Sequence, residues 1–168
     1  MKLSFIFWAF AVAVTSLTIR PSAAHASDQQ SMFDLVTGSW VASGNSFGPD
    51  VKSEMTWSKT LDGRFYKIDY RIIMDAASDE TFTGIGHYQA TESNTTAGYW
   101  ADNSGDLHPL SVTIEKDAIL SIWGVAGGKQ GRTEYRLVGE GRMWVTDWLL
   151  TGDGWRQFNT ASFVRKPS

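Results

Sequence analysis

The 168-residue sequence contains no cysteine, only four prolines and only three histidines. Without cysteine, the chain can form neither a disulfide framework nor a lipoprotein anchor. His25 lies close to the N-terminus, so only His87 and His108 remain for the rest of the chain. A zinc site built from three histidines is therefore excluded, and any metal site there would need carboxylates. No metal is expected.

The sequence also lacks an apolar run long enough to cross a membrane as a helix. Its longest run, Leu3–Val14, is shorter than the roughly 20 residues that a membrane span needs. The run follows Lys2 and precedes the A-x-A pattern of residues 24–26, an order typical of a secretory signal peptide. We therefore predict cleavage after Ala26, export to the periplasm or the medium, and one domain over residues 27–168.

Basic residues are few once this signal peptide (residues 1–26) is set aside. Lys2 and Arg20 belong to it, so 13 of the 15 basic residues remain against all 18 acidic ones, a net charge of −5. A negative surface disfavours nucleic acid and anionic membranes as partners. The sequence predicts no oligomeric state.

Aromatic residues and short alternating segments are what the sequence has in abundance. The clearest segment, 65–74, places Tyr66, Ile68, Tyr70 and Ile72 on one face, with charged residues between them. Similar segments predict ten strands, the others being one that opens at Gly38 and those at 51–57, 81–90, 95–102, 108–115, 118–124, 132–138, 142–150 and 155–166. Short connections and one apolar face per strand predict an all-β fold, either a closed antiparallel up-and-down barrel or a sandwich.

Other features add detail to this fold. Residues 32–35 can form one helical turn that caps a barrel mouth. Gly84 and Gly86, two residues apart on one strand face, would make room there for a large neighbouring side chain or for a sharp coil of the sheet. Gly38 and Trp40 open the first strand, and Arg165 lies in the last one.

Several short motifs occur in an order that resembles a known group of proteins. They are residues 38–40, 61–65, 84–88, 98–102, 131–135, 153–155 and 163–165. Together they resemble the bacterial lipocalin-like, calycin-type domains of unknown function, related to lipocalins, fatty-acid-binding proteins and nitrobindins. The resemblance implies a closed antiparallel barrel of about ten strands with an inner cavity. It also implies a closure in which Gly38 admits the bend, Trp40 plugs one end and Arg165 stacks across the indole. Nitrobindins hold haem through a histidine near the C-terminal end; residues 155–166 contain none, so no cofactor is expected.

Two local patterns suggest chemistry that their context does not support, and the two histidines are considered after them. Residues 44–48 match G-x-S-x-G, but a nucleophile elbow needs a helix after it, and another strand follows here, so Ser46 is expected in a loop. Residues 102–106 resemble a calcium loop but lack the glycine and the bidentate glutamate at the offsets that such a loop requires, so they are expected to form a hairpin turn. His87 can point into the cavity or outward, whereas His108 is expected at the surface.

The aromatic side chains predict a ligand site inside the barrel, because indole and phenol groups suit a mostly apolar molecule. Asp147, between Thr146 and Trp148, should lie on the face opposite the tryptophans and be solvated. The predicted ligand-binding residues are Trp57, Tyr66, Tyr70, His87, Trp100, Trp123, Tyr135, Trp144 and Trp148.

Three functions fit these features. The preferred one is binding or carrying a small hydrophobic or amphipathic molecule. A cofactor-free enzyme of isomerase or hydrolase type, using groups such as Glu54, Tyr70, His87 and Asp102, is the first alternative. A structural or interaction protein with a filled barrel is the second. An open cavity favours binding, buried titratable groups favour catalysis, and a packed interior favours the structural role.

Overall fold

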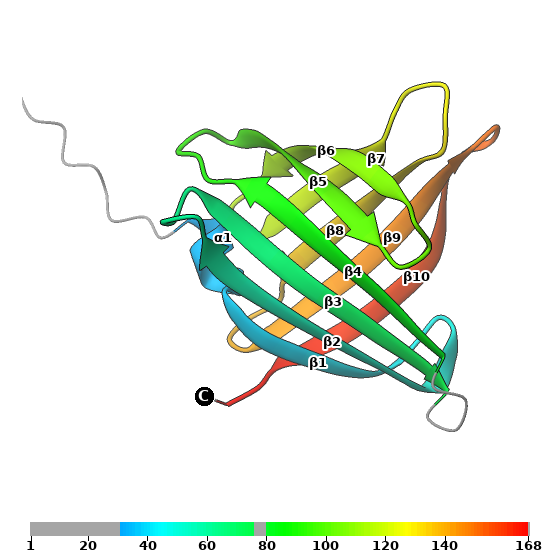
Figure 1. Ribbon diagram of the computed structural model, residues 1–168. Helices are drawn as coiled ribbons and strands as arrows, with labels where there is room; N and C mark the ends of the chain where they lie inside the picture. Colours follow the sequence, from blue (N-terminus) through cyan, green and yellow to red (C-terminus); the bar gives the residue numbers. More distant parts are fainter. Residues whose placement is uncertain (1–30, 76–79, 168) are drawn as a thin grey trace, which may run out of the picture.

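The computed structural model describes residues 31–75 and 80–167. The predicted signal peptide and its cleavage after Ala26 lie outside the described residues. Within the described part, one short helix precedes ten strands, with their order shown in Figure 1. The elements are α1 (Met32–Val36), β1 (Gly38–Asn45), β2 (Gly48–Thr60), β3 (Phe65–Asp75), β4 (Glu80–Gln89), β5 (Thr95–Asp102), β6 (Leu107–Ile114), β7 (Ala118–Gly124), β8 (Gln130–Leu137), β9 (Arg142–Thr151) and β10 (Gly154–Arg165).

The ten strands form a closed antiparallel barrel. Each strand pairs with the next one along the chain, and β10 returns to pair with β1. Closure leaves no free sheet edge in the barrel, which satisfies the backbone groups of the first and last strands. The prediction of an all-β, up-and-down barrel of about ten strands is confirmed, and the sandwich is excluded.

Alternation along the strands separates the inside of the barrel from the outside. In β2, every second residue from Val51 to Trp57 is buried, and the residues between them are exposed. Each large apolar side chain buried in this way stabilises the fold by about 1.5 to 3 kcal/mol. The segment Phe65–Asp75 follows the same rule, with Tyr66, Ile68 and Ile72 buried.

Helix α1 closes one end of the barrel, as Figure 1 shows at the left. The Phe33 ring stacks on Tyr66 at 4.8 Å between centroids, and it also contacts Trp57 and Tyr88. The Tyr66 hydroxyl donates to Asp34 Oδ1 at 2.7 Å. This end is therefore filled by aromatic packing, and the helical turn predicted over residues 32–35 is present.

Candidate functional site

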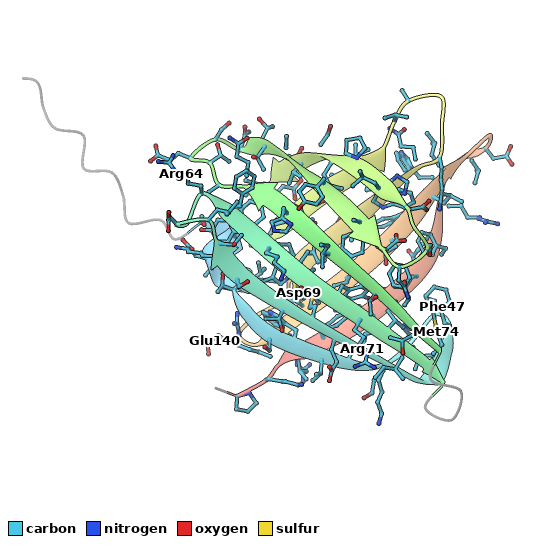
Figure 2. All side chains as sticks on the ribbon, in the orientation of Figure 1. Phe47, Arg64, Asp69, Arg71, Met74 and Glu140 are labelled. Carbon is cyan, nitrogen blue, oxygen red and sulfur yellow. The ribbon has the colours of Figure 1, made fainter. Side chains whose placement is uncertain are left out.

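A cavity of about 420 Å³ occupies the part of the barrel away from α1. Its lining includes Phe47 and Met74, which Figure 2 shows at the end of the barrel opposite Arg64 and Glu140. The volume falls within the range of about 300 to 1,000 Å³ that is usual for small-molecule sites. The barrel thus has one end packed by aromatic side chains and an inner space towards the other end.

A second hollow, of about 550 Å³, lies over β2 to β5 and is wide open to solvent. Its lining includes Glu54, Asp69 and Arg71, the last two of which Figure 2 labels on the outer face of β3. Although it is the larger of the two, it is a shallow surface depression. We therefore regard the inner cavity as the candidate site, because enclosure is what removes an apolar ligand from water.

Three tyrosines line the inner cavity: Tyr70 from β3, Tyr88 from β4 and Tyr135 from β8. Burial raises the pKa of all three phenols, so they are neutral at physiological pH. The Tyr88 hydroxyl lies 3.5 Å from Ser121 Oγ. The Tyr70 hydroxyl is buried without a hydrogen-bond partner, although the nearby Ser53 hydroxyl counteracts part of its pKa rise. The tyrosines thus give the cavity wall an aromatic surface with polar tips.

Two tryptophans of the cavity lie against glycines on neighbouring strands. A Cβ on Gly84 would stand 2.1 Å from a ring atom of Trp100, and a Cβ on Gly131 would stand 1.9 Å from a ring atom of Trp123. Only glycine leaves the room that each indole occupies. The expectation that Gly84 makes space for a large neighbour is confirmed, and Gly131 does the same for Trp123.

Asp147 of β9 lies inside the barrel, which corrects the expectation that it is solvated. Its Oδ1 accepts a hydrogen bond from Thr133 Oγ1 at 2.7 Å, and its Oδ2 accepts one from Asn159 Nδ2 at 2.9 Å. All three residues line the cavity. Burial raises the pKa of the Asp147 carboxyl, and the two hydrogen bonds oppose that rise. The site therefore contains a carboxyl group in a largely apolar cavity.

The opposite face of β9 carries Trp144 and Trp148, which were expected inside. Trp144 is 44% exposed, and the guanidinium carbon of Arg132 lies 4.1 Å from the ring centre of Trp148. The same guanidinium carbon lies 5.4 Å from the Trp155 ring. The alternation along β9 was predicted correctly, but its inner and outer faces were exchanged. A cation between two indoles stabilises these aromatic rings on the outer surface.

A bulge in β10 places the partner of Asp147. The register between β10 and β9 shifts between Gln157 and Asn159, so that Asn159 pairs with Asp147 across the sheet. Asn159 is 2% exposed, and its Oδ1 has no hydrogen-bond partner. A bulge adds a residue to one strand and so changes the face to which the following side chains point; here it turns Asn159 inward. Sequence reasoning missed Asn159, because the bulge changes the inward period of the strand.

The outer part of the cavity carries charged groups. Asp106 forms an ion pair with Lys129 at 2.8 Å, and its Oδ2 lies 3.5 Å from His108 Nε2. The His108 ring packs against Trp123 at 5.2 Å between centroids. His108 was expected at the surface, and the structure instead places it in the cavity wall. The Trp100 indole donates to Asp102 at 3.1 Å in the same region.

The remaining predicted ligand residues lie away from the cavity. His87 points outward and stacks on Tyr99 at 5.0 Å between centroids; burial, followed by the charge of Lys67, lowers its pKa. Trp57 and Tyr66 belong to the packing at the α1 end. Of the nine predicted residues, the structure brings four to the cavity, namely Tyr70, Trp100, Trp123 and Tyr135.

The closure residues meet at the α1 end. The guanidinium carbon of Arg165 lies 4.2 Å from the centre of the Trp40 ring. A Cβ on Gly38 would stand 2.6 Å from Arg165 Nη1. Arg165 therefore lies against both Trp40 and Gly38, the other two residues that the calycin resemblance singled out.

The motifs set aside in the sequence have structural roles. Ser46 lies in the turn between β1 and β2, and its Oγ accepts from the backbone nitrogen of Thr160 at 2.9 Å. With no helix after it, residues 44–48 do not form a nucleophile elbow. Asp102 Oδ1 accepts from the Ser104 nitrogen in the predicted hairpin turn. Within residues 31–75 and 80–167, no cluster of three histidine, aspartate or glutamate side chains is placed to hold a metal ion.

The closed barrel is consistent with a calycin-type fold. No protein-family model matches the sequence, and no curated protein matches it. Among the described residues, no helix has the length and hydropathy needed to cross a bilayer.

Proposed function

We propose that this protein is an exported, calycin-type barrel that binds or carries a small, largely apolar molecule in its inner cavity. The observation that carries the proposal is the cavity itself, about 420 Å³ of space within the barrel. A protein with only a structural role would gain stability by filling this space, because protein interiors are otherwise close-packed. The aromatic lining and a few polar groups match what small-molecule sites usually contain.

A matched pair of variants on β9 tests this proposal. Leu149 lines the cavity, and its neighbour Leu150 is exposed on the outside. Leu149→Trp should fill the cavity and abolish binding, whereas Leu150→Trp should leave it unchanged. Native mass spectrometry of protein purified from its own source would identify a retained ligand, and thermal shifts with a panel of apolar alcohols, amines and acids would measure binding. Absence of any retained ligand or thermal shift would refute a binding role.

Export is the second part of the proposal, and the signal-peptide pattern of residues 1–26 supports it. N-terminal sequencing of the protein from its source should begin at Ser27. A mature protein that starts at Met1 would contradict export by this route. This outcome would leave the binding proposal intact, since cleavage and binding concern different parts of the chain.

Catalysis is a second candidate function, and the Asp147 carboxyl within the cavity is the observation that favours it. Burial raises the pKa of this carboxyl towards the range in which a general acid or base works. Of the groups considered from the sequence, Tyr70 and Asp102 line the cavity with it, whereas Glu54 and His87 do not. Turnover of a bound compound by the wild type, and its loss in Asp147→Asn with binding retained, would favour an enzyme over a carrier.

A further inference from the structure

Asp147 is a cavity carboxyl without a cationic partner. Among the residues that the structure describes, it forms no ion pair, and its hydrogen bonds come from the neutral Thr133 and Asn159. The titratable groups that face it are phenols: Tyr135 from β8, Tyr70 from β3 and Tyr88 from β4. Asp147 is half-buried in a largely apolar cavity, and a carboxylate in such surroundings is stabilised by a counter-charge, because desolvation is costly without one.

The basic side chains of the cavity lie further towards its outer part. Lys129 is paired with Asp106, and His108 also lies near that carboxyl. Arg156 is exposed and lines the cavity from β10. None of the three contributes to the shift in the pKa of Asp147. The negative charge at Asp147 is therefore open to a cation brought by a ligand.

Two further polar groups of the same cavity have unused capacity to accept a hydrogen bond. Asn159 Oδ1 belongs to the amide group whose nitrogen donates to Asp147, so it lies next to the carboxyl. The Tyr70 hydroxyl is buried beside the Ser53 hydroxyl with no hydrogen bond formed between them, and the Asp147 charge contributes to raising the pKa of Tyr70. Its oxygen can accept a hydrogen bond from a ligand. With the Asp147 carboxyl, Asn159 Oδ1 and the Tyr70 oxygen form a group that can accept hydrogen bonds from one ligand head group. Buried polar atoms are rarely left unpaired, so this group points to a ligand with several hydrogens to donate.

The three common polar head groups differ in how they fit these acceptors. An ammonium carries three donors, no acceptor and a positive charge. A hydroxyl carries one donor, and a carboxylate carries none and would be repelled by Asp147. The rings of Trp100, Trp123 and Tyr135 also attract a cation through their faces.

We infer that the cavity takes a small hydrophobic amine, with its protonated nitrogen at Asp147, Asn159 and Tyr70 and its apolar body among the tryptophans. The inference deepens the proposed function and rests on it. It also excludes fatty acids and other carboxylates as the preferred ligands, in contrast to what the fatty-acid-binding relatives of the calycin group suggest. Because the free carboxyl has a raised pKa, binding a cation should favour its ionised form and release a proton where the free group is protonated.

Three probes with the same phenyl-ethyl body and different head groups test this inference. They are 2-phenylethylamine, 2-phenylethanol and 3-phenylpropanoate, each titrated calorimetrically into the full mature protein. The amine should bind most tightly and the propanoate most weakly. In Asp147→Asn, the affinity for the amine should fall about 30-fold or more, the usual result of removing one partner of a buried charge pair. The affinity for the alcohol should stay within about threefold, since a neutral head group makes no charge pair there.

A second variant separates Asp147 from the outer charges. Arg156→Ala should leave the amine affinity unchanged or raise it slightly, because a positive side chain is removed from the path of a cation. If the wild type instead binds the propanoate most tightly and Arg156→Ala loses this preference, the inference is overturned and Arg156 is the residue that recognises the head group. Preference for the alcohol, or an amine affinity that Asp147→Asn leaves unchanged, would also overturn it while the binding proposal stands. If none of the three probes nor any compound of the wider panel binds, the proposed function itself fails.

Discussion

Arg165 and Trp40 join the last strand of the barrel to its first. The guanidinium carbon lies 4.2 Å from the centre of the indole ring. The guanidinium donates to the carbonyl oxygens of Leu35 and Thr37, and Trp40 Nε1 donates to the carbonyl of Val36 at 2.8 Å. These two side chains therefore hold α1 against the place where the barrel closes.

Removing either side chain should weaken the closure, but by different amounts. Trp40→Ala should reduce the free energy of unfolding by about 3 to 5 kcal/mol, because Trp40 is fully buried. Arg165→Ala should reduce the free energy of unfolding by less, because Arg165 is exposed to solvent and its loss leaves no cavity in the core. The double variant should depart from additivity by about 0.5 kcal/mol or more, as expected of residues in contact. Urea unfolding of the four proteins measures this, and additive effects would mean that the stack contributes nothing.

Gly38 is needed both for its backbone conformation and for the space beside Arg165. Its φ is +125°, and a Cβ there would stand 2.6 Å from Arg165 Nη1. Gly38→Ala should therefore destabilise the protein by more than the roughly 1 to 3 kcal/mol of backbone strain alone, because the Arg165 guanidinium would have to move away from the carbonyls of Leu35 and Thr37. Gly139→Ala is the matched control, because Gly139 has a φ of +110° and no atom within 4 Å of the added Cβ. Equal losses in the two variants, measured by urea unfolding, would show that contact with Arg165 adds no cost.

The strands could be predicted because apolar and polar residues alternate along each of them. Turn residues interrupt this alternation and mark where a strand ends. Residues 95–102 and 118–124 match β5 and β7 at both ends, and the other predicted boundaries differ by at most three residues. A period of two determines which residues share a face. It does not determine which of the two faces points into the barrel. In β9 the alternation was predicted correctly, but the inner face was not.

Hydrophobicity alone placed Trp144 and Trp148 inside and Asp147 outside. The structure reverses this, because Met143 and Val145 occupy the inner face with Asp147. Arg132, 4.1 Å from the Trp148 ring centre, stabilises the outer indole from the neighbouring strand. Such a cross-strand contact depends on register, which the sequence of a single strand does not contain. Asp147 and Asn159 could therefore be placed in the candidate site only from the assembled barrel.

Gly131 sets the position of the Trp123 ring in the cavity wall. A Cβ at this residue would stand 1.9 Å from a ring atom, so Gly131→Ala should displace the indole. We expect a loss of about 1 to 3 kcal/mol in the free energy of unfolding, typical of overpacking, and a change in near-ultraviolet circular dichroism. Gly152→Ala, in a turn with no atom within 4 Å, should change neither. An unchanged spectrum in Gly131→Ala would mean that the ring does not lie against this glycine.

Asp147 should make the stability of the protein depend on pH in a direction opposite to that of most carboxyl groups. Burial raises the pKa of Asp147 above its usual value near 3.9, so the folded state holds the proton more tightly than the unfolded chain. The contribution of this group to stability is therefore fully present below that usual value and is lost as pH rises through the folded pKa. Asp147→Asn removes this titration. Its melting temperature relative to the wild type should rise between pH 4 and pH 7, as measured by calorimetry in the absence of ligand.

The amide can replace the carboxyl without losing its partners. Thr133 Oγ1 can donate to the new carbonyl oxygen, and the new amide nitrogen can donate to Asn159 Oδ1, which has no partner in the wild type, once the Asn159 amide rotates. Asp153→Asn, at an exposed aspartate in the turn after β9, is the matched control for replacing a carboxyl by an amide outside the cavity. If Asp147→Asn is instead less stable than the wild type at pH 7 and equal to it at pH 4, the folded state favours the ionised carboxylate. In that case the hydrogen bonds from Thr133 and Asn159 would stabilise the Asp147 carboxylate without a cation. An amine that binds there would then release no proton.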